Sequence, residues 1–307
     1  MKKEETKILQ FSSISDAHRA FGLPKPVHPL ISLIDNSIHH IDITTLTHSH
    51  ALAFYKISYK PRHSGKLKYG QGYYDFDEGG LLFASPGQII GHHTESDIND
   101  CSQYTLLIHP DFLLNYPLAK NIKQYGFFSY SVNEALHWSD QEKEIILSIF
   151  KNIGTEINSR IDEFSQDVII SQIELLLNYS NRFYKRQFIT RKAVHNEYLV
   201  RLETIFEEYF SDEKFFTNGL PTVQFLADKL NISPSYLSDM LRSLTGQNAQ
   251  QHIHSKIIEN AKIKLSATDL TISEIAYQLG FEHPQSFSRL FKNKTNLSPV
   301  EFRASFN

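Results

Sequence analysis

The sequence predicts a multidomain α+β chain, in which an N-terminal β-barrel or jelly roll with packing helices precedes an all-α domain. Short β-type segments dominate residues 30–109, helical periodicity begins near residue 139, and one helical unit is written twice within residues 221–302. The chain has 307 residues, and a domain usually takes roughly 150. Length and pattern therefore agree on at least two domains.

The composition is that of a globular protein. Hydrophobic residues make up 41% of the chain, and the formal net charge is -3, so the chain is no bulk polycation that coats nucleic acid. The single cysteine, Cys101, excludes an intramolecular disulfide and is typical of a reducing compartment. No apolar run approaches the ~18 residues of a membrane helix, and no apolar signal core follows the N-terminus. We expect a cytoplasmic protein.

The N-terminal part begins with an expected leader (1–27), followed by an expected β domain (28–137). Strand-like segments occupy 31–34, 52–59, 80–84 and 103–109, separated by Gly, Pro, Asn and Asp turns. Many short strands without intervening helices favour a sandwich or barrel. Residues 77–88 combine a Gly turn, an apolar strand and a Pro-Gly turn, which resembles the hairpin of a cupin-type jelly roll.

Histidines are frequent in this β domain. In His48-Ser49-His50 both imidazole rings would lie on one face of a strand. Cupin enzymes use a similar pair with a later Glu and His to bind Fe, Mn or Zn, but here Ala51-Leu52-Ala53-Phe54 follows instead. We therefore expect no metal, no cofactor and no catalytic residue. We predict that an effector pocket is lined by His48, His50, Tyr55 and Tyr73, with ordinary core packing as the alternative.

The next part of the chain (138–188) is expected to be helical. Ser139 and Glu142 form a capping-box signature, and two runs of apolar residues at helical spacing follow, ending near Arg186. These helices could cover the β domain, join a second copy of the chain, or both. Residues 189–196 show no clear period and are expected to be a linker to the last domain (197–307).

The last domain contains an internal repeat of one helical unit. Its first copy has Ala227, then Asn231 and Ile232, then Leu237 and Leu241; its second copy has Ala276, then Gly280 and Phe281, then Phe287 and Phe291. The alanines suit close helix crossing, and Asn or Gly tolerates the positive φ that the turn needs. The offset between the copies grows by one residue after the turn, so one residue has been added there. This order predicts two helix-turn-helix units, each with one outward polar helix face.

The second copy carries a more specific pattern. The segments 272–276, Gly280-Phe281, 286–292 and Leu297-Ser298-Pro299 resemble the AraC/XylS family of bacterial transcription regulators. The resemblance covers about the last third of the chain, and Asn296 replaces the family's usual Gly. It implies a double helix-turn-helix that binds double-stranded DNA, and an N-terminal cupin-like domain for effector sensing or dimerisation. It also implies a possible small-molecule effector, a homodimer and, for an activator, RNA polymerase as partners.

The candidates for DNA contact lie near the start of each second helix. We predict base contacts from Ser235, Tyr236, Ser238, Asp239, Gln285, Ser286 and Arg289, and phosphate contacts from Arg242, Lys292 and Lys294. Gln can pair with adenine and Arg with guanine, so the second unit should read more bases. Asp239 could accept from a cytosine amine, but a local ion pair with Lys229 or Arg242 is the simpler interpretation.

Two other functions are compatible with parts of the sequence. The first is a cupin metalloenzyme with a helical appendage, which needs a complete ligand set in the barrel. The second is a helical interaction module without DNA contact, in which Gln285 and Arg289 would be buried or paired. The sequence contains no phosphate-binding loop, nucleophile elbow or Cys-x-x-Cys motif, which lowers the prior for the common nucleotide-binding and hydrolase classes.

Overall fold

The chain is represented by a computed structural model. It describes residues 9–38, 50–61, 67–69, 72–74, 80–90, 103–130, 134, 136, 138–160, 162–190, 192–211 and 219–305. The chain divides into two compact units, Met1–Gln187 and Phe188–Asn307, and each is described by itself. Among the described residues, every helix is too short or too polar to cross a membrane.

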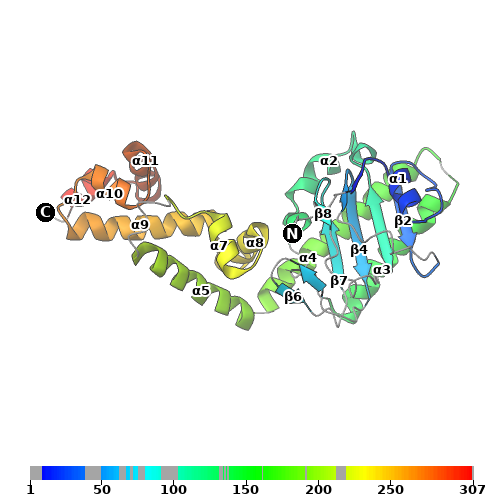
Figure 1. The fold of residues 1–307 in the computed structure, drawn as a ribbon, viewed down its shortest axis with the longest axis horizontal. Helices are drawn as coiled ribbons and strands as arrows, with labels where there is room; N and C mark the ends of the chain where they lie inside the picture. Colours follow the sequence, from blue (N-terminus) through cyan, green and yellow to red (C-terminus); the bar gives the residue numbers. More distant parts are fainter. Residues whose placement is uncertain are drawn as a thin grey trace, which may run out of the picture. The chain divides into compact units, whose positions relative to one another are not determined.

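The first unit is built on a four-stranded antiparallel sheet (Figure 1). Its strand order is β2 (Ile31–Asp35), β9 (Tyr104–Ile108), β4 (Tyr55–Lys60) and β7 (Gly80–Ala84). The strands consist largely of β-branched, aromatic and leucine residues, which suit a sheet buried on both faces. All five residues of β9 are buried, as expected for a central strand.

Two smaller sheets accompany it. One contains β1 (Leu9–Phe11), β3 (His50–Leu52) and β8 (Ile89–Ile90), and the other contains β5 (Leu67–Tyr69) and β6 (Gly72–Tyr74). The fold is thus mixed α+β, as predicted. Within the described residues these sheets do not close into a barrel.

Within the expected leader (1–27), the described residues from Leu9 onward form part of the first unit. Strand β1 pairs in parallel with β3, and α1 (Ile14–Ala20) follows it. Ile14 is fully buried in a cluster with residues of β2, β3 and β9. The apolar residues of this segment are too dispersed to predict a strand or helix alone, and their partners lie far along the chain.

Helices and short 3-10 turns complete the first unit. In chain order they are η3 (Pro110–Leu113), α2 (Leu118–Asn121), η4 (Ile122–Gln124), η5 (Gly126–Ser129), α3 (Asp140–Asn158) and α4 (Ser165–Thr190). Helix α3 packs against the sheet, where the rings of Phe150 and Tyr104 stack at 5.6 Å between centroids. One face of the sheet is therefore covered by helix.

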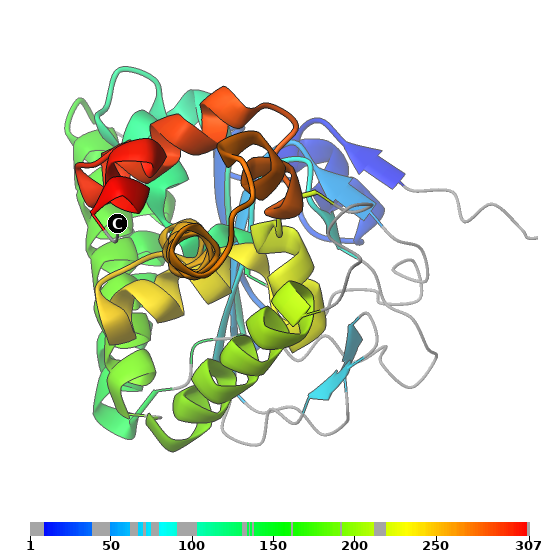
Figure 2. The same ribbon diagram turned by 90° about the vertical axis from the view of Figure 1, so that its left-hand side faces the viewer.

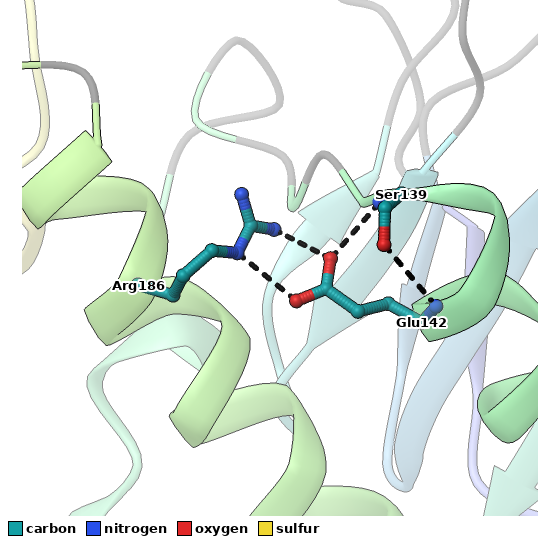
Figure 3. A network of polar contacts seen from close by, with 3 residues as sticks. All are labelled: Ser139, Glu142 and Arg186. Carbon is teal, nitrogen blue, oxygen red and sulfur yellow. Dashed lines mark hydrogen bonds and ion pairs between the residues drawn. The ribbon is translucent and has the colours of Figure 1, made fainter.

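The predicted capping box at the start of α3 is confirmed. Ser139 Oγ accepts a hydrogen bond from Glu142 N, and Glu142 Oε2 accepts one from Ser139 N (Figure 3). The same carboxylate receives two hydrogen bonds from Arg186 of α4, at 3.0 Å from Nε and 2.7 Å from the terminal nitrogen. The bidentate pair fixes the start of α3 against α4.

The second unit is helical throughout its described residues. After α5 (Lys192–Ser211) come α7 (Val223–Leu230), α8 (Pro234–Thr245), α9 (Ala249–Ala267), α10 (Ile272–Gln278), α11 (Pro284–Thr295) and α12 (Pro299–Ala304). Helix α9 runs through the unit, with α5 on one side and α10, α11 and α12 on the other (Figures 1 and 2). Lys256 of α9 forms ion pairs with Glu203 of α5 and with Glu259.

The predicted linker is also corrected. Residues 189 and 190 end α4, and residues 192–196 open α5, so both flanks of the expected linker are helical. His195 is buried, and its Nδ1 lies 2.8 Å from the carbonyl oxygen of Phe188. Because the polar His195 occupies a buried position, the buried face of this helix does not read as an apolar pattern in the sequence.

Candidate nucleic-acid interface

The turns of both repeated units have the predicted backbone. Asn231 has φ of 56° and Gly280 has φ of 86°, both in the left-handed region. In each turn the following residue donates a hydrogen bond back into the first helix, from Ile232 N to the Ala227 oxygen at 3.1 Å and from Phe281 N to the Ala276 oxygen at 3.0 Å. Each first helix therefore ends in the same cap.

The inner faces of the second helices are buried as predicted. Leu237 and Leu241 of α8 are fully buried, as are Phe287 and Phe291 of α11. The small residues Ala227 and Ala276 are also fully buried in the first helices, which permits close helix contact. Packing uses one side of each second helix and leaves the other side outward.

The added residue lies in the second turn. Helix α8 begins at Pro234 after one capping residue, Ser233, whose Oγ accepts a hydrogen bond from Tyr236 N at 3.2 Å. Helix α11 begins at Pro284 after Glu282 and His283, and the His283 side chain makes no capping hydrogen bond. The insertion thus changes the helix start and leaves the packing of the unit intact.

The duplication continues beyond the second helices. Helix α8 ends at Gly246 with φ of 78°, and α11 ends at Asn296 with φ of 64°. The next helix opens in both copies with a capping box, from Asn248 and Gln251 in α9 and from Ser298 and Glu301 in α12. Asn296 therefore fulfils the left-handed role expected of the Gly that it replaces.

A close backbone contact holds the second turn against the segment before α7. A Cβ atom added to Gly280 would lie 2.6 Å from the carbonyl carbon and oxygen of Gly219. The Gly219 oxygen also accepts a hydrogen bond of 2.8 Å from the Tyr209 hydroxyl of α5. Helix α5, this segment and the second turn therefore form one contact region. This region helps fix the two helix-turn-helix units relative to each other.

The outward face of α11 is available for contact. Gln285, Ser286 and Arg289 are exposed. Within the described chain, no side chain hydrogen-bonds or ion-pairs with Gln285 or Arg289. Lys292 and Lys294 are exposed in the last turn of the same helix. These donors lie where adenine, guanine and phosphate acceptors could be met, and they contradict the interaction module with buried or paired Gln285 and Arg289.

The outward face of α8 is different. Tyr236, predicted as a base contact, is only 7% exposed, which disfavours contact between this side chain and a base. Its ring lies 5.1 Å from that of Phe188, and its hydroxyl lies 3.4 Å from His195 Nε2. The two partners come from the segment expected to be a linker, which is why the sequence pattern of α8 alone did not reveal the burial.

Asp239 follows the simpler of its two interpretations. Its Oδ1 accepts a hydrogen bond of 2.9 Å from Arg242, one turn further along α8. The pair occupies both a predicted base contact and a predicted phosphate contact. Ser235 and Ser238 remain partly exposed on the same helix, but hydroxyl groups discriminate weakly between bases. No measurement of DNA contact tests these assignments, which remain predictions.

Several titratable groups in the second unit have pKa values shifted by their surroundings. Burial, together with the charge of Lys294, lowers the pKa of His254 on α9, so this imidazole is mostly neutral at pH 7. A hydrogen bond from the Ser298 backbone lowers the pKa of Glu301, and one from the Thr271 backbone lowers that of Glu274. The permanent positive charge of this surface therefore comes from lysine and arginine.

The predicted effector residues are not gathered in one described pocket. His50 is buried beside the rings of Phe11 and Phe21, and Tyr55 packs at 5.2 Å against Phe128. Burial raises the pKa of Tyr55. His48 and the side chain of Tyr73 lie outside the described part, as does Cys101. The effector pocket stays a prediction, with core packing favoured for His50 and Tyr55.

Comparison with known proteins agrees with this geometry. The family model described as "Helix-turn-helix domain" matches residues 226–305, which run from within α7 to the end of α12. Residues 226–305 are a helix-turn-helix domain. Proteins similar in sequence to part of this chain are described as transcription regulators of the helix-turn-helix type.

The similar sequences are those of regulators. An uncharacterized HTH-type transcriptional regulator of Escherichia coli, YijO, is 30% identical over 109 residues, which cover 35% of this chain and 38% of that protein. A Staphylococcus aureus regulator is 30% identical over 139 residues, covering 45% of this chain and 17% of that protein. The chain thus spans well under half of these relatives. The arabinose operon regulatory protein of Salmonella typhimurium is 26% identical over 230 residues, covering 74% of this chain and 75% of that protein.

A solved structure is also similar in sequence to part of this chain. The C-terminal domain of the response regulator yesN from Fusobacterium nucleatum is 33% identical and covers 33% of this chain and 93% of that chain, with a TM-score of 0.29. Because this score is low, the domain is identified by its sequence and its own helix geometry. The similar proteins are described as regulatory proteins.

Proposed function

We propose that this chain is a sequence-specific, DNA-binding transcription regulator of the AraC/XylS type, acting in the cytoplasm. The observation that carries the proposal is the outward face of α11, where Gln285 and Arg289 have no partner side chain in the described chain. Long donors on a helix of this kind are suited to base edges in the major groove. Lys292 and Lys294 would contact phosphates and position the helix.

The two reading helices would enter successive major grooves on one face of the duplex. Such grooves are about 34 Å apart, and α9 together with the contact at Gly219 and Gly280 would keep α8 and α11 at a fixed spacing. A fixed spacing predicts two half-sites about one helical turn apart. The half-site under α11 should be the more specific, because Asp239 and Arg242 of α8 are paired with each other.

The first unit would govern how the DNA-binding unit is presented. We infer a cupin-like domain that senses a small molecule or joins two copies of the chain through α3 and α4. A ligand could shift that balance only by binding one arrangement more tightly than another. As an activator, the protein would also contact RNA polymerase. The similarity to the arabinose operon regulatory protein over 74% of the chain supports this part of the proposal.

Selection of bound duplexes from random DNA by the purified full chain tests the proposal. We expect a common sequence to be enriched, and the enriched duplex to bind at least about a thousandfold more tightly than unselected DNA, as specific complexes do. Binding that is equal for all duplexes would contradict sequence-specific regulation. Absence of binding at low salt would contradict any role in DNA contact.

A further inference from the structure

A cavity of about 350 Å³ lies in the first unit, and its described lining includes none of the predicted effector residues. It opens beside the edge strand β2, between η3, the end of α3 and the start of α4. Its described lining residues are apolar, acidic or neutral polar, and include no lysine or arginine. They are His28, Leu30, Ile31, Phe112, Glu156, Ile157, Asp162, Glu163, Ser165, Gln166 and Ile169.

The floor of the cavity is apolar and fixed. Ile31, Ile157 and Ile169 belong to the core, and Phe112 is also buried. His28 packs edge-on to Phe112, with ring centroids 5.4 Å apart. Burial lowers the pKa of His28, so this ring is predominantly neutral at pH 7 and adds no opposing charge. The floor therefore suits a flat apolar group, with aromatic edges and faces beside it.

The rim of the cavity is acidic. Asp162 is already engaged, because its Oδ1 accepts hydrogen bonds from Phe164 N and Ser165 Oγ at the start of α4. The carboxylates of Glu156 and Glu163 make no hydrogen bond or ion pair with any residue that the structure describes. Two carboxylates thus line a cavity with an apolar floor, and no lysine or arginine lies among the described lining residues.

The helix ends reinforce this sign of charge. Glu156 and Ile157 lie in the last turn of α3, where the backbone carbonyls carry partial negative charge. Just before α4, the Asp162 carboxylate accepts a hydrogen bond from Phe164 N and so adds negative charge near the opposite, positive helix end. A cation in the cavity would therefore be stabilised by Glu156, by Glu163 and by the end of α3.

We propose that this cavity binds a small organic cation, with an amine at the acidic rim and an apolar or aromatic body on the floor. The amine would donate to the carboxylates of Glu156 and Glu163, and the body would cover Phe112, Ile157 and Ile169. Gln166 supports the floor, because its Nε2 donates a hydrogen bond of 2.9 Å to the Phe112 oxygen. The site does not depend on DNA binding by the second unit.

Calorimetric titration of the full chain with three matched probes tests the proposal. The probes are 2-phenylethylamine, the neutral 2-phenylethanol and the anionic 3-phenylpropanoate, which share one aromatic body. We expect the amine to bind about tenfold more tightly than the alcohol and the anion to bind more weakly still, because the rim carries negative charge. Added salt should weaken binding of the amine and leave binding of the alcohol unchanged.

Two carboxylate variants locate the site. Glu156→Gln and Glu163→Gln should each weaken amine binding several-fold, and together about tenfold, with alcohol binding unchanged. Glu144→Gln, which removes an exposed carboxylate from the same helix α3 outside the cavity, is the control and should bind like the unaltered chain. Equal binding of amine and alcohol, no binding of any probe at millimolar concentration, or an equal loss in Glu144→Gln would overturn the proposal.

Discussion

The two helix-turn-helix units share a backbone and differ in what their second helices present. Both have a left-handed turn residue, a buried pair at i,i+4 and a left-handed end before a capping box. Helix α8 buries Tyr236 and pairs Asp239 with Arg242, whereas α11 exposes Gln285 and Arg289. The duplication thus retained the residues that fix the backbone and changed those that face outward. Structural equivalence of two reading helices does not imply equal readout.

The largest effect is expected at Gly280, where the second helix-turn-helix turn contacts the segment before the first helix-turn-helix unit. Gly280→Ala should destabilise the second unit by about 3 kcal/mol or more, from positive φ and a clash with the Gly219 backbone. Gly246→Ala shares the positive φ but has open space around the added Cβ, so it should cost only ~1 kcal/mol. Denaturant unfolding of both variants measures the difference, and equal costs would show that the Gly219 contact is unimportant.

A smaller effect is expected from the lysines at the end of α11. Replacing Lys292 and Lys294 by Ala should lower DNA affinity about tenfold for every sequence, since phosphate contacts carry no base information. The slope of log affinity against log salt should fall by about one per lysine. Lys120→Ala with Lys123→Ala, which removes the same charge from the first unit, is the control. An unchanged salt slope would remove these lysines from the interface.

A still smaller and opposite effect is expected in α8. Asp239→Asn removes a carboxylate from the reading helix and releases Arg242 from its ion pair. Affinity should rise by about two- to fivefold, mostly at low salt, because one more cation is available to phosphate. Asp269→Asn changes net charge equally in a loop before α10 and serves as control. A fall in affinity, with changed preference at one base pair, would instead assign Asp239 to cytosine.

The smallest effect concerns acid. The pKa of Glu301 lies below its ordinary value of 4.5 in the folded chain, because the Ser298 backbone donates to its carboxylate. This contribution to stability is present above pH 4.5 and is lost as pH falls through the lowered pKa. Glu301→Gln should therefore make stability less dependent on pH below about 4.5. Melting curves from pH 3 to 7 test this expectation. The control is Gln251→Ala, which removes an uncharged side chain from the capping box of α9 and should leave the pH dependence of stability unchanged.

The parts predicted well from the sequence depend on local physical chemistry. Positive φ at Asn231, Gly280 and Asn296 follows from the tolerance of Asn and Gly, and the capping box at Ser139 follows from its side chains. The extra residue in the second turn follows from the change in repeat offset. The left-handed residues and the capping box involve residues within one turn of one another, and the offset is read directly from the aligned copies, so a sequence pattern can reveal all of them.

The parts that the sequence did not reveal depend on distant contacts. Tyr236 is buried beside Phe188 and His195, which precede it by 41 residues or more, so the pattern of α8 could not show its burial. The supposed leader is part of the core because α1 packs on residues of β2, β3 and β9. The acidic cavity cannot be predicted from the sequence for the same reason, because its lining comes from four separate segments.

Selection of bound duplexes by the unaltered chain and by Arg289→Ala tests the central claim most directly. The account predicts two half-sites about one helical turn apart, one sharply defined and one weakly defined. Arg289→Ala should lose preference at one guanine of the sharp half-site and bind the original sequence with ~1–3 kcal/mol less free energy. Identical selected sequences and affinities for the two proteins would contradict the assignment of α11 as the principal reading helix.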